Sequence, residues 1–206
     1  MQSVRKWPMD KSKLREKFLR DRETIPETEK IRKSKTITEL VLSSSFYNDA
    51  KKIFCFISVP GEPDTAEIIL DAFSRGKAVC IPRTKPGRVM ETVLVDLDVY
   101  KSAAEDWPVV LGIPEPPLSL GQTDPAECDL VLVPSVAVDI YGYRLGHGGS
   151  YYDAFIAQSI KNQKRPVFLA IQFSEFLRSE ALPREEHDMK VDLIATENGI
   201  ITPLSV

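Results

Sequence analysis

The residues with the clearest capacity for chemistry lie between Leu130 and Phe155, in the stretch LVLVPSVAVDIYGYRLGHGGSYYDAF. An apolar run opens this stretch, four of the ten glycines of the chain follow, and a helical pattern begins at Tyr151. Glycine lacks a Cβ and permits positive φ, so such a loop lets the backbone approach a ligand closely. A glycine loop that enters a helix also presents free N–H groups and the positive end of the helix dipole, which favour phosphate. Arg144 adds a forked cation within the loop.

An ordinary glycine-rich turn between a strand and a helix is the simpler interpretation of the same residues. The loop matches neither G-x-G-x-x-G nor G-x-x-x-x-G-K-[ST], the two best-attested nucleotide-binding patterns. Composition alone therefore leaves the choice between a turn and a phosphate site open.

Two further cations, Lys11 and Arg15, lie four residues apart near the N-terminus. Asp10 can cap a helix there, and Leu14 and Phe18 supply an apolar stripe. The spacing places both cations on one helix face. Cations in the first turn oppose the helix dipole and are poorly placed unless an anion lies nearby. A solvated basic face is the alternative.

Carboxylates occur at three positions that matter. Glu62 follows the apolar run 52–59, a predicted buried strand whose carboxyl end is where open α/β sheets bind ligands. Asp153 starts the helix after the glycine loop, and Asp188 belongs to an acidic cluster at 185–192. Two separated carboxylates fit a nucleotide-bound magnesium ion. The alternatives are a solvated loop carboxylate for Glu62 and a helix-dipole partner for Asp153.

The histidines offer less. His147 lies between glycines and is interpreted as a ligand contact at most, and His187 is expected to orient its loop. No Ser–His–Asp or Cys–His arrangement can be placed from spacing.

Strands that alternate with helical patterns predict the elements that position these residues. Helices are expected from Asp10, after Pro26 and from Tyr151 to Ile160, and strands at 52–59, 77–82, 88–99, 167–173 and 191–196, with a closing hairpin at 197–201. The proline-containing segment 98–123 is expected to be an ordered crossover within one domain.

Local patterns add detail to these elements. Ile31 is expected on or near the buried face of the helix after Pro26. Asp64 and Glu67 fit a capping box for a helix over residues 68–73, and Gly76 fits its C′ position. Neither Arg144 nor Asp153 is expected in the apolar core.

The bulk composition is that of one globular domain. The chain has 206 residues, a net charge of −3 and no apolar run long enough for a transmembrane helix or a signal peptide. The mild acidity gives no support to binding of nucleic acid or anionic membranes. Cys55, Cys80 and Cys128 lie far apart in sequence and indicate buried, reduced thiols of a cytoplasmic protein.

The segment RLGHGGSYYD, residues 144–153, resembles the RLGxGxGYYD signature of 5-formyltetrahydrofolate cyclo-ligases, also called methenyltetrahydrofolate synthetases. Further family motifs follow the family order: KxxLR at 11–15, E-x-D-T at 62–65, G-I-x-E-P at 112–116 and HDMKVD at 187–192. The resemblance therefore covers nearly the whole chain. It departs at Pro63, where an aliphatic residue is usual, and at Ser150, where the family usually has glycine.

The resemblance implies an α/β fold, namely a single three-layer αβα domain over residues 1–206 with a mainly parallel sheet. It implies ATP-dependent conversion of 5-formyltetrahydrofolate to 5,10-methenyltetrahydrofolate, in a monomer that acts on small molecules and needs Mg²⁺ with ATP. ATP would bind at Lys11, Ser12, Lys13, Leu14, Arg15, Arg144, Gly146, Gly148, Gly149 and Tyr152. Folate would bind at Ile57, Glu62, His147, Gly148, Gly149, Ser150 and Tyr151. Asp153 and Asp188 would hold the metal, and Arg144 would be catalytic.

Two alternatives stay open at this level. One is a catalytically idle paralogue that binds folate or nucleotide for regulation, with Ser150 as its only support. A serine at a position that needs positive φ would cost about 1 kcal/mol. The other is a nucleotide-using enzyme of the same architecture with a different acceptor.

We expect the N-terminal helix to fold back so that Lys11 and Arg15 reach the glycine loop.

Overall fold

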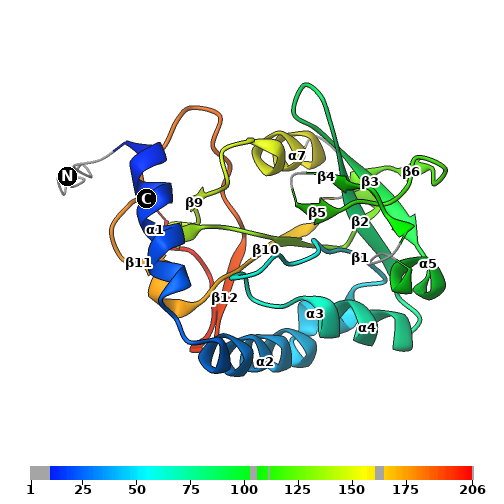
Figure 1. Cartoon of the computed structure of the whole chain (residues 1–206), viewed down its shortest axis with the longest axis horizontal. Helices are drawn as coiled ribbons and strands as arrows, with labels where there is room; N and C mark the ends of the chain where they lie inside the picture. The colour runs from blue at the N-terminus through cyan, green and yellow to red at the C-terminus, as the bar shows by residue number, and fades with distance from the viewer. Residues whose placement is uncertain (1–9, 103–105, 111, 161–164, 206) are drawn as a thin grey trace.

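A central sheet organises the chain, and helices lie on both of its faces (Figure 1). The structure is a computed structural model that describes residues 10–102, 106–110, 112–160 and 165–205. Within these residues the main sheet has eight strands in the order β13-β12-β10-β7-β1-β2-β3-β6. Their bounds are β1 Lys52–Phe54, β2 Ala78–Lys85, β3 Val89–Val95, β6 Gln122–Thr123, β7 Leu130–Val133, β10 Val167–Ile171, β12 Leu193–Thr196 and β13 Gly199–Ile201.

The middle of this sheet is parallel. β12, β10, β7, β1 and β2 run in one direction, whereas β3 and β13 pair antiparallel with β2 and β12, and β6 pairs antiparallel with β3. Crossover helices between parallel strands cover the faces of such a sheet, so its inner strands are buried on both sides. The expectation of a mainly parallel sheet is confirmed, and so is the closing hairpin, which β12 and β13 form.

The strand β7 shows how three layers arise. Leu130 and Leu132 belong to the core on one face, and Val131 and Val133 belong to the core on the other, because successive side chains alternate. The first core is covered by α1 Lys11–Glu23, α2 Glu27–Ser43, α3 Ser45–Asp49 and α4 Ala66–Ser74, and the second by α7 Tyr151–Ser159. The chain is therefore a three-layer αβα fold, as expected.

Shorter elements surround this framework. A three-stranded sheet joins β11 Leu177–Arg178, β8 Ala137–Asp139 and β9 Arg144–Leu145, and β4 Val109–Val110 pairs with β5 Ile113–Pro114. The helix α5 Leu97–Lys101 and the 3-10 helices Pro125–Glu127 and Ser174–Phe176 lie in connections. Where the structure describes it, the segment 98–123 is ordered, as expected of a crossover.

The end of α4 matches its prediction, whereas its start does not. Gly76 adopts φ 68° and its N–H donates to Phe73 O, while the next N–H donates to Ala72 O, as in a Schellman motif. The capping box is wrong, because α4 begins one residue later with Thr65 at the N-cap. The Thr65 hydroxyl donates to Phe56 O instead, and Asp64 accepts from Ala66 N.

One predicted strand boundary and one predicted buried residue also need correction. The strand predicted at 52–59 ends at Phe54, since the chain then leaves the sheet and Phe56, Ile57 and Val59 line a cavity. Ile31 is 63% exposed, although Ile37 on the same helix is buried. Helical periodicity allows a wide stripe of apolar positions, and only those that face the sheet of this fold are covered.

The cysteines are free and buried, as expected. No helix within the described ranges is long and apolar enough to cross a membrane.

Candidate active site

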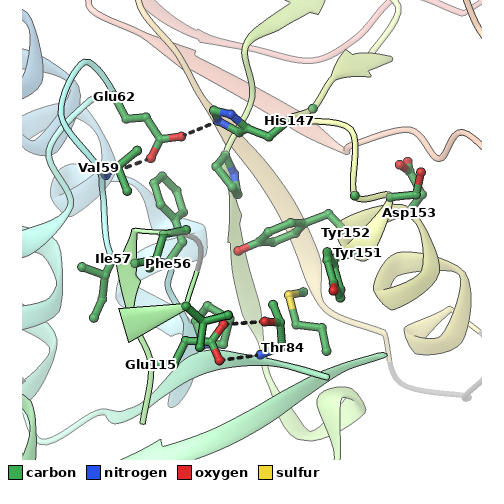
Figure 2. A pocket seen from close by; sticks show the side chains of 18 of the residues that line it. Phe56, Ile57, Val59, Glu62, Thr84, Glu115, His147, Tyr151, Tyr152 and Asp153 are labelled. Atoms are coloured by element: carbon green, nitrogen blue, oxygen red, sulfur yellow. Dashed lines mark hydrogen bonds and ion pairs between the residues drawn. The ribbon is translucent and has the colours of Figure 1, made fainter. Parts of the chain in front are cut away.

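A cavity of about 290 Å³ lies at the carboxyl ends of β1, β2 and β7. Parallel α/β sheets bind ligands at this edge, because loops from several strands converge there. Its apolar walls come from Phe56, Ile57, Val59, Met90, Ile113 and Pro134. Polar side chains lie at its ends, as Figure 2 shows.

Most of the predicted site residues meet at this cavity. Those that line it are Ile57, Glu62, Arg144, Gly146, His147, Gly149, Ser150, Tyr151, Tyr152 and Asp153. The remaining ones, Lys11, Ser12, Lys13, Leu14, Arg15, Gly148 and Asp188, are not part of the lining. These seven residues lie at different positions around the cavity, and each position determines whether the residue can contact a bound ligand.

The helix α1 does fold back onto the glycine loop. Arg15 Nε donates to Gly146 O at 2.7 Å, and its guanidinium lies 3.4 Å from where a Cβ on Gly148 would be. Lys11 Nζ lies 2.5 Å from Asp188 Oδ2. The expected approach to the glycine loop is thus confirmed for Arg15, whereas Lys11 pairs with Asp188 in the turn at 185–188.

Other residues of the KxxLR segment have different surroundings. Leu14 is fully buried and fixes the helix on the core, while Ser12 and Lys13 are exposed. Asp10 caps the helix by accepting from Lys13 N, as predicted. Arg22, near the end of the helix, donates to Ser135 O and Val136 O, which ties α1 to the chain after β7.

Arg144 is held in a buried ion pair. Its side chain is 3% exposed, but it lines the cavity and belongs to neither hydrophobic core, so the expectation that it would lie outside the apolar core is confirmed. Arg144 Nη1 donates to Asp153 Oδ1 at 3.0 Å and to Met189 O at 3.2 Å, and the guanidinium lies over the Tyr152 ring. A buried guanidinium is tolerable only with such partners.

The turn before Arg144 is organised by Asp139, which the sequence did not single out. Its carboxylate accepts from the N–H groups of Tyr141, Tyr143 and Leu182, and it is fully buried. Burial raises the pKa of Asp139, and these hydrogen bonds act in the opposite direction. The clamp fixes the start of β9 and hence the position of Arg144.

Backbone strain and close packing shape the entry to α7. Ser150 adopts the left-handed conformation, with φ 52° and ψ 20°, so this position does require positive φ. A Cβ on Gly149 would lie 2.7 Å from the Tyr151 ring, so any other residue here would force that ring to move. Tyr151 and Tyr152, which follow this tight passage, both line the cavity.

Glu62 and His147 pair at the glycine-loop end of the cavity (Figure 2). His147 Nε2 lies 3.1 Å from Glu62 Oε1, while Glu62 Oε2 accepts from Val59 N at 3.2 Å. The Glu62 side chain is 5% exposed although it begins in a loop, so the interpretation as a solvated carboxylate is wrong.

Tyr152 presents a buried hydroxyl with no hydrogen-bond partner among the described residues. Burial raises the pKa of Tyr152 well above its ordinary value, and nearby Glu62 adds to the effect. The phenol therefore stays protonated. Because a buried hydroxyl without a hydrogen-bond partner costs free energy, a ligand that bonds to it would gain affinity.

A third carboxylate that lines the cavity, Glu115, entered the sequence analysis only as part of a motif. It is 6% exposed, and its two oxygens accept from the hydroxyl and the N–H of Thr84. The G-I-x-E-P motif was the available signal. The pairing with Thr84 could not be inferred, because the two residues are 31 positions apart.

The two predicted metal ligands occupy neighbouring positions. Met189 N donates to Asp153 Oδ1, which places Asp188 next to the start of α7. The described residues contain no group of three or more His, Cys, Asp or Glu that could hold a metal. Magnesium with a nucleotide needs only one or two carboxylates, because phosphates and water supply the other ligands. The donor set suits that arrangement and not an all-protein metal site.

His187 lies beside this region, with Nε2 3.5 Å from Glu185 Oε2, and it is about half exposed. The Glu185 N–H donates to Asp188 Oδ2 at 2.6 Å. The short turn thus orients Asp188 through the backbone of Glu185, and the expected orienting role of His187 stays a prediction.

The parallel sheet and the cavity at its carboxyl edge are features of an α/β enzyme that acts on small molecules. Residues 8–197 match the 5-formyltetrahydrofolate cyclo-ligase family, and the chain belongs to this family. It is 31% identical over 183 residues to the 5-formyltetrahydrofolate cyclo-ligase of Mus musculus, covering 83% of this chain and 85% of the relative. It is 32% identical over 186 residues to a probable 5-formyltetrahydrofolate cyclo-ligase of Caenorhabditis elegans, covering 86% and 87%.

Solved structures agree with this assignment. The NMR structure of the Aquifex aeolicus 5,10-methenyltetrahydrofolate synthetase superposes with a TM-score of 0.77 at 27% identity, covering 96% of this chain and 95% of that one. A Mycoplasma pneumoniae 5,10-methenyltetrahydrofolate synthetase superposes with a TM-score of 0.71 at 19% identity, covering 92% and 99%, and supports the fold.

Proposed function

We propose that the protein uses ATP to convert 5-formyltetrahydrofolate to 5,10-methenyltetrahydrofolate, with release of ADP and phosphate. The observation that carries this proposal is the composition of the cavity at the carboxyl edge of the sheet. An apolar slot for a flat ring system adjoins a glycine loop on which Arg15 and Arg144 converge. A phosphoryl donor and an apolar acceptor can therefore be held side by side.

The nucleotide phosphates bind at the glycine loop. N–H groups of Gly146, Gly148 and Gly149 face the phosphates, and Arg144 and Arg15 neutralise their charge. Lys11 supplies a further cation from the same face of α1. Leu14 is in the core, so its contribution to binding is confined to its backbone. Ser12 and Lys13 lie exposed beside it, and Tyr152 packs under the Arg144 guanidinium.

The folate binds in the apolar slot. Ile57 and Tyr151 contact its rings, and Glu62 and His147 contact polar atoms near the formyl group, next to Gly148, Gly149 and Ser150. Asp153 and Asp188 hold Mg²⁺ together with the nucleotide. When bound, this ion supplies further neutralisation of charge on the phosphate oxygens.

The reaction requires positioning more than acid–base groups. The formyl oxygen attacks the γ-phosphorus, and ADP leaves. N10 then attacks the activated formyl carbon and loses its proton to water, the carbon–oxygen bond breaks, and phosphate departs with the former formyl oxygen. Arg144 is the catalytic residue in this scheme, because it stabilises the charge that develops on the transferred phosphoryl group.

The test is turnover by the purified protein with MgATP and 5-formyltetrahydrofolate, followed by the absorbance of the methenyl product and by ADP release. We expect both in equal amounts. Folded protein that forms neither would overturn the proposal. ADP release with another formylated amine, but not with this folate, would identify an enzyme with a different acceptor. Binding of both substrates without turnover would identify an idle paralogue.

A further inference from the structure

The cavity contains a second buried carboxylate that the assignments above do not use. Glu115 directly follows β5 and is 6% exposed. Glu115 Oε1 accepts from the Thr84 hydroxyl at 2.6 Å, and Oε2 accepts from Thr84 N at 3.1 Å. Both residues line the cavity. A carboxylate buried among apolar side chains must be stabilised by hydrogen-bond donors, because burial of a charge costs free energy.

Glu115 lies at the opposite end of the cavity from the glycine loop. Figure 2 shows the Glu62–His147 pair at one end and the Glu115–Thr84 pair at the other, with the Tyr152 ring between them. His147 belongs to the glycine loop, and the neighbouring Gly146 carbonyl accepts from Arg15, so the loop and this cation lie towards the first end. The two carboxylates therefore meet different parts of any ligand that fills the slot.

The hydrogen bonds from Thr84 occupy only part of the acceptor capacity of the Glu115 carboxylate. Each carboxylate oxygen has two lone pairs, so after the two bonds from Thr84 each oxygen can accept one more hydrogen bond. The remaining acceptor positions suit N–H donors of a planar group that reaches the carboxylate from the side not occupied by Thr84. The 2-amino-4-oxopyrimidine ring of a folate presents such donors, N3–H and the 2-amino group.

The reaction geometry fixes which edge of the folate faces Glu115. N5 carries the formyl group and must lie near the glycine loop, where the γ-phosphate is. The 2-amino edge belongs to the other ring of the fused system and points away from N5 and N10. With the formyl group at the Glu62 end, that edge is directed to the Glu115 end.

We propose that Glu115 is the specificity residue that recognises the 2-amino-4-oxopyrimidine edge of the folate, with Thr84 holding its carboxylate in place. This inference rests on the proposed function, since it uses the folate orientation that phosphoryl transfer requires. The competing explanation is a purely structural latch, in which Glu115 only fastens the β4–β5 segment to β2.

The test measures direct binding without ATP, by calorimetry, of 5-formyltetrahydrofolate and of its analogue in which a methyl group replaces the 2-amino group. We expect wild-type protein to bind the analogue about 10- to 100-fold more weakly, the effect of losing one charge-assisted hydrogen bond. The variant Glu115→Gln should bind the natural folate more weakly by a similar factor and discriminate little between the two ligands. Its affinity for ADP should be unchanged.

The variant Thr84→Val is the matched control, since it removes the latch hydroxyl and keeps the carboxylate. It should retain most of the discrimination. A structural latch predicts instead that Glu115→Gln and Thr84→Val both lower the melting temperature and weaken both ligands equally. That result, or wild-type protein that binds both ligands equally, would overturn the inference. If Glu115→Gln fails to fold, equal binding of the two ligands by wild-type protein still overturns the inference, and Glu115→Asp replaces Glu115→Gln as the variant that must lose discrimination.

Failure of this inference is distinct from failure of the proposed function. Wild-type turnover of 5-formyltetrahydrofolate establishes the function, whatever Glu115 does. Discrimination between the two ligands reports on the pyrimidine edge alone.

Discussion

At the scale of single residues, the Arg144–Asp153 pair joins stability to chemistry. Arg144 is the proposed catalytic cation and Asp153 a proposed metal ligand, and the two form an ion pair with each other. Arg144→Ala and Asp153→Asn should each lower turnover by at least ~100-fold, the scale of losing one preorganised charge contact. Each should also lower the free energy of unfolding, because it leaves a partly buried charge without its partner.

The double variant Arg144→Ala with Asp153→Asn separates the two effects in this pair. Since no unpaired charge remains, it should regain part of the lost stability in urea denaturation and none of the turnover. Wild-type turnover in either single variant would contradict the assignment of its residue.

Ser150 illustrates a tolerated departure from the family pattern. Its left-handed backbone costs a serine about 1 kcal/mol, whereas glycine costs about 0.5–1 kcal/mol more conformational entropy on folding. Ser150→Gly should therefore change the free energy of unfolding by less than about 1 kcal/mol, because the two effects oppose each other. Ser150→Val, with a β-branched side chain in the same conformation, should lose clearly more. Equal stability of the glycine and valine variants in denaturant titrations would show that the strain is absent.

At the scale of elements, α1 acts as a clamp on the glycine loop. Lys11 and Arg15 project from one face of the helix, and Leu14, Phe18 and Arg22 fix it to the rest of the molecule. The combined variant Lys11→Ala with Arg15→Ala should raise the Michaelis constant for ATP by about tenfold or more for each lost phosphate contact. Affinity for the folate without nucleotide should change little.

The matched control for this clamp is Lys17→Ala. Lys17 is a cation of the same helix that pairs with Asp21 on an exposed face. Its removal should leave the Michaelis constant for ATP unchanged. An equal rise in both variants would mean that general charge, and not the face towards the loop, governs ATP binding.

The elements show what could be predicted and what could not. The C′ role of Gly76 and the cap at Asp10 depend on residues close in sequence, so local patterns sufficed. The ranges of the sheet strands were predicted only approximately. The early end of β1 and the N-cap at Thr65 depend on how the chain turns into the cavity, a tertiary effect.

The site follows the same division. The family motifs predicted most residues of the cavity, but not their mutual contacts. The Asp139 clamp depends on Leu182, the Glu115–Thr84 pair spans 31 positions, and Arg144 is buried only because Asp153 and Met189 are in place. Such contacts arise when distant segments meet, and no periodicity encodes them.

At the scale of the whole molecule, a buried ion pair joins α2 to the hairpin at the end of the chain. Lys33 Nζ lies 2.8 Å from Glu197 Oε1, with both side chains under 10% exposed. Burial raises the pKa of Glu197, but hydrogen bonds from Lys33 and Ser174 outweigh it and hold the pKa below its ordinary value of 4.5. The ion pair therefore stabilises the folded protein fully at pH values above the ordinary pKa. This stabilisation is lost as the pH falls through the lowered pKa.

The expected outcome is an acid-sensitive stability that depends on Glu197. Glu197→Gln should melt earlier than wild type at neutral pH, and the two melting temperatures should converge as the pH falls through the carboxyl range. Glu16→Gln, at an exposed carboxylate on α1, serves as the control and should follow wild type throughout. A difference between Glu197→Gln and wild type that does not depend on pH would contradict the role of this ionisation.

The central claim is that one cavity holds the folate and ATP so that the formyl oxygen takes the γ-phosphoryl group. The most direct measurement is the mass of the phosphate released from 5-formyltetrahydrofolate that carries a heavy-oxygen label in its formyl group. The account predicts that each phosphate contains one labelled oxygen, formed together with one methenyl product. Unlabelled phosphate from a turning-over enzyme, with the label in water or retained in the folate, would contradict it.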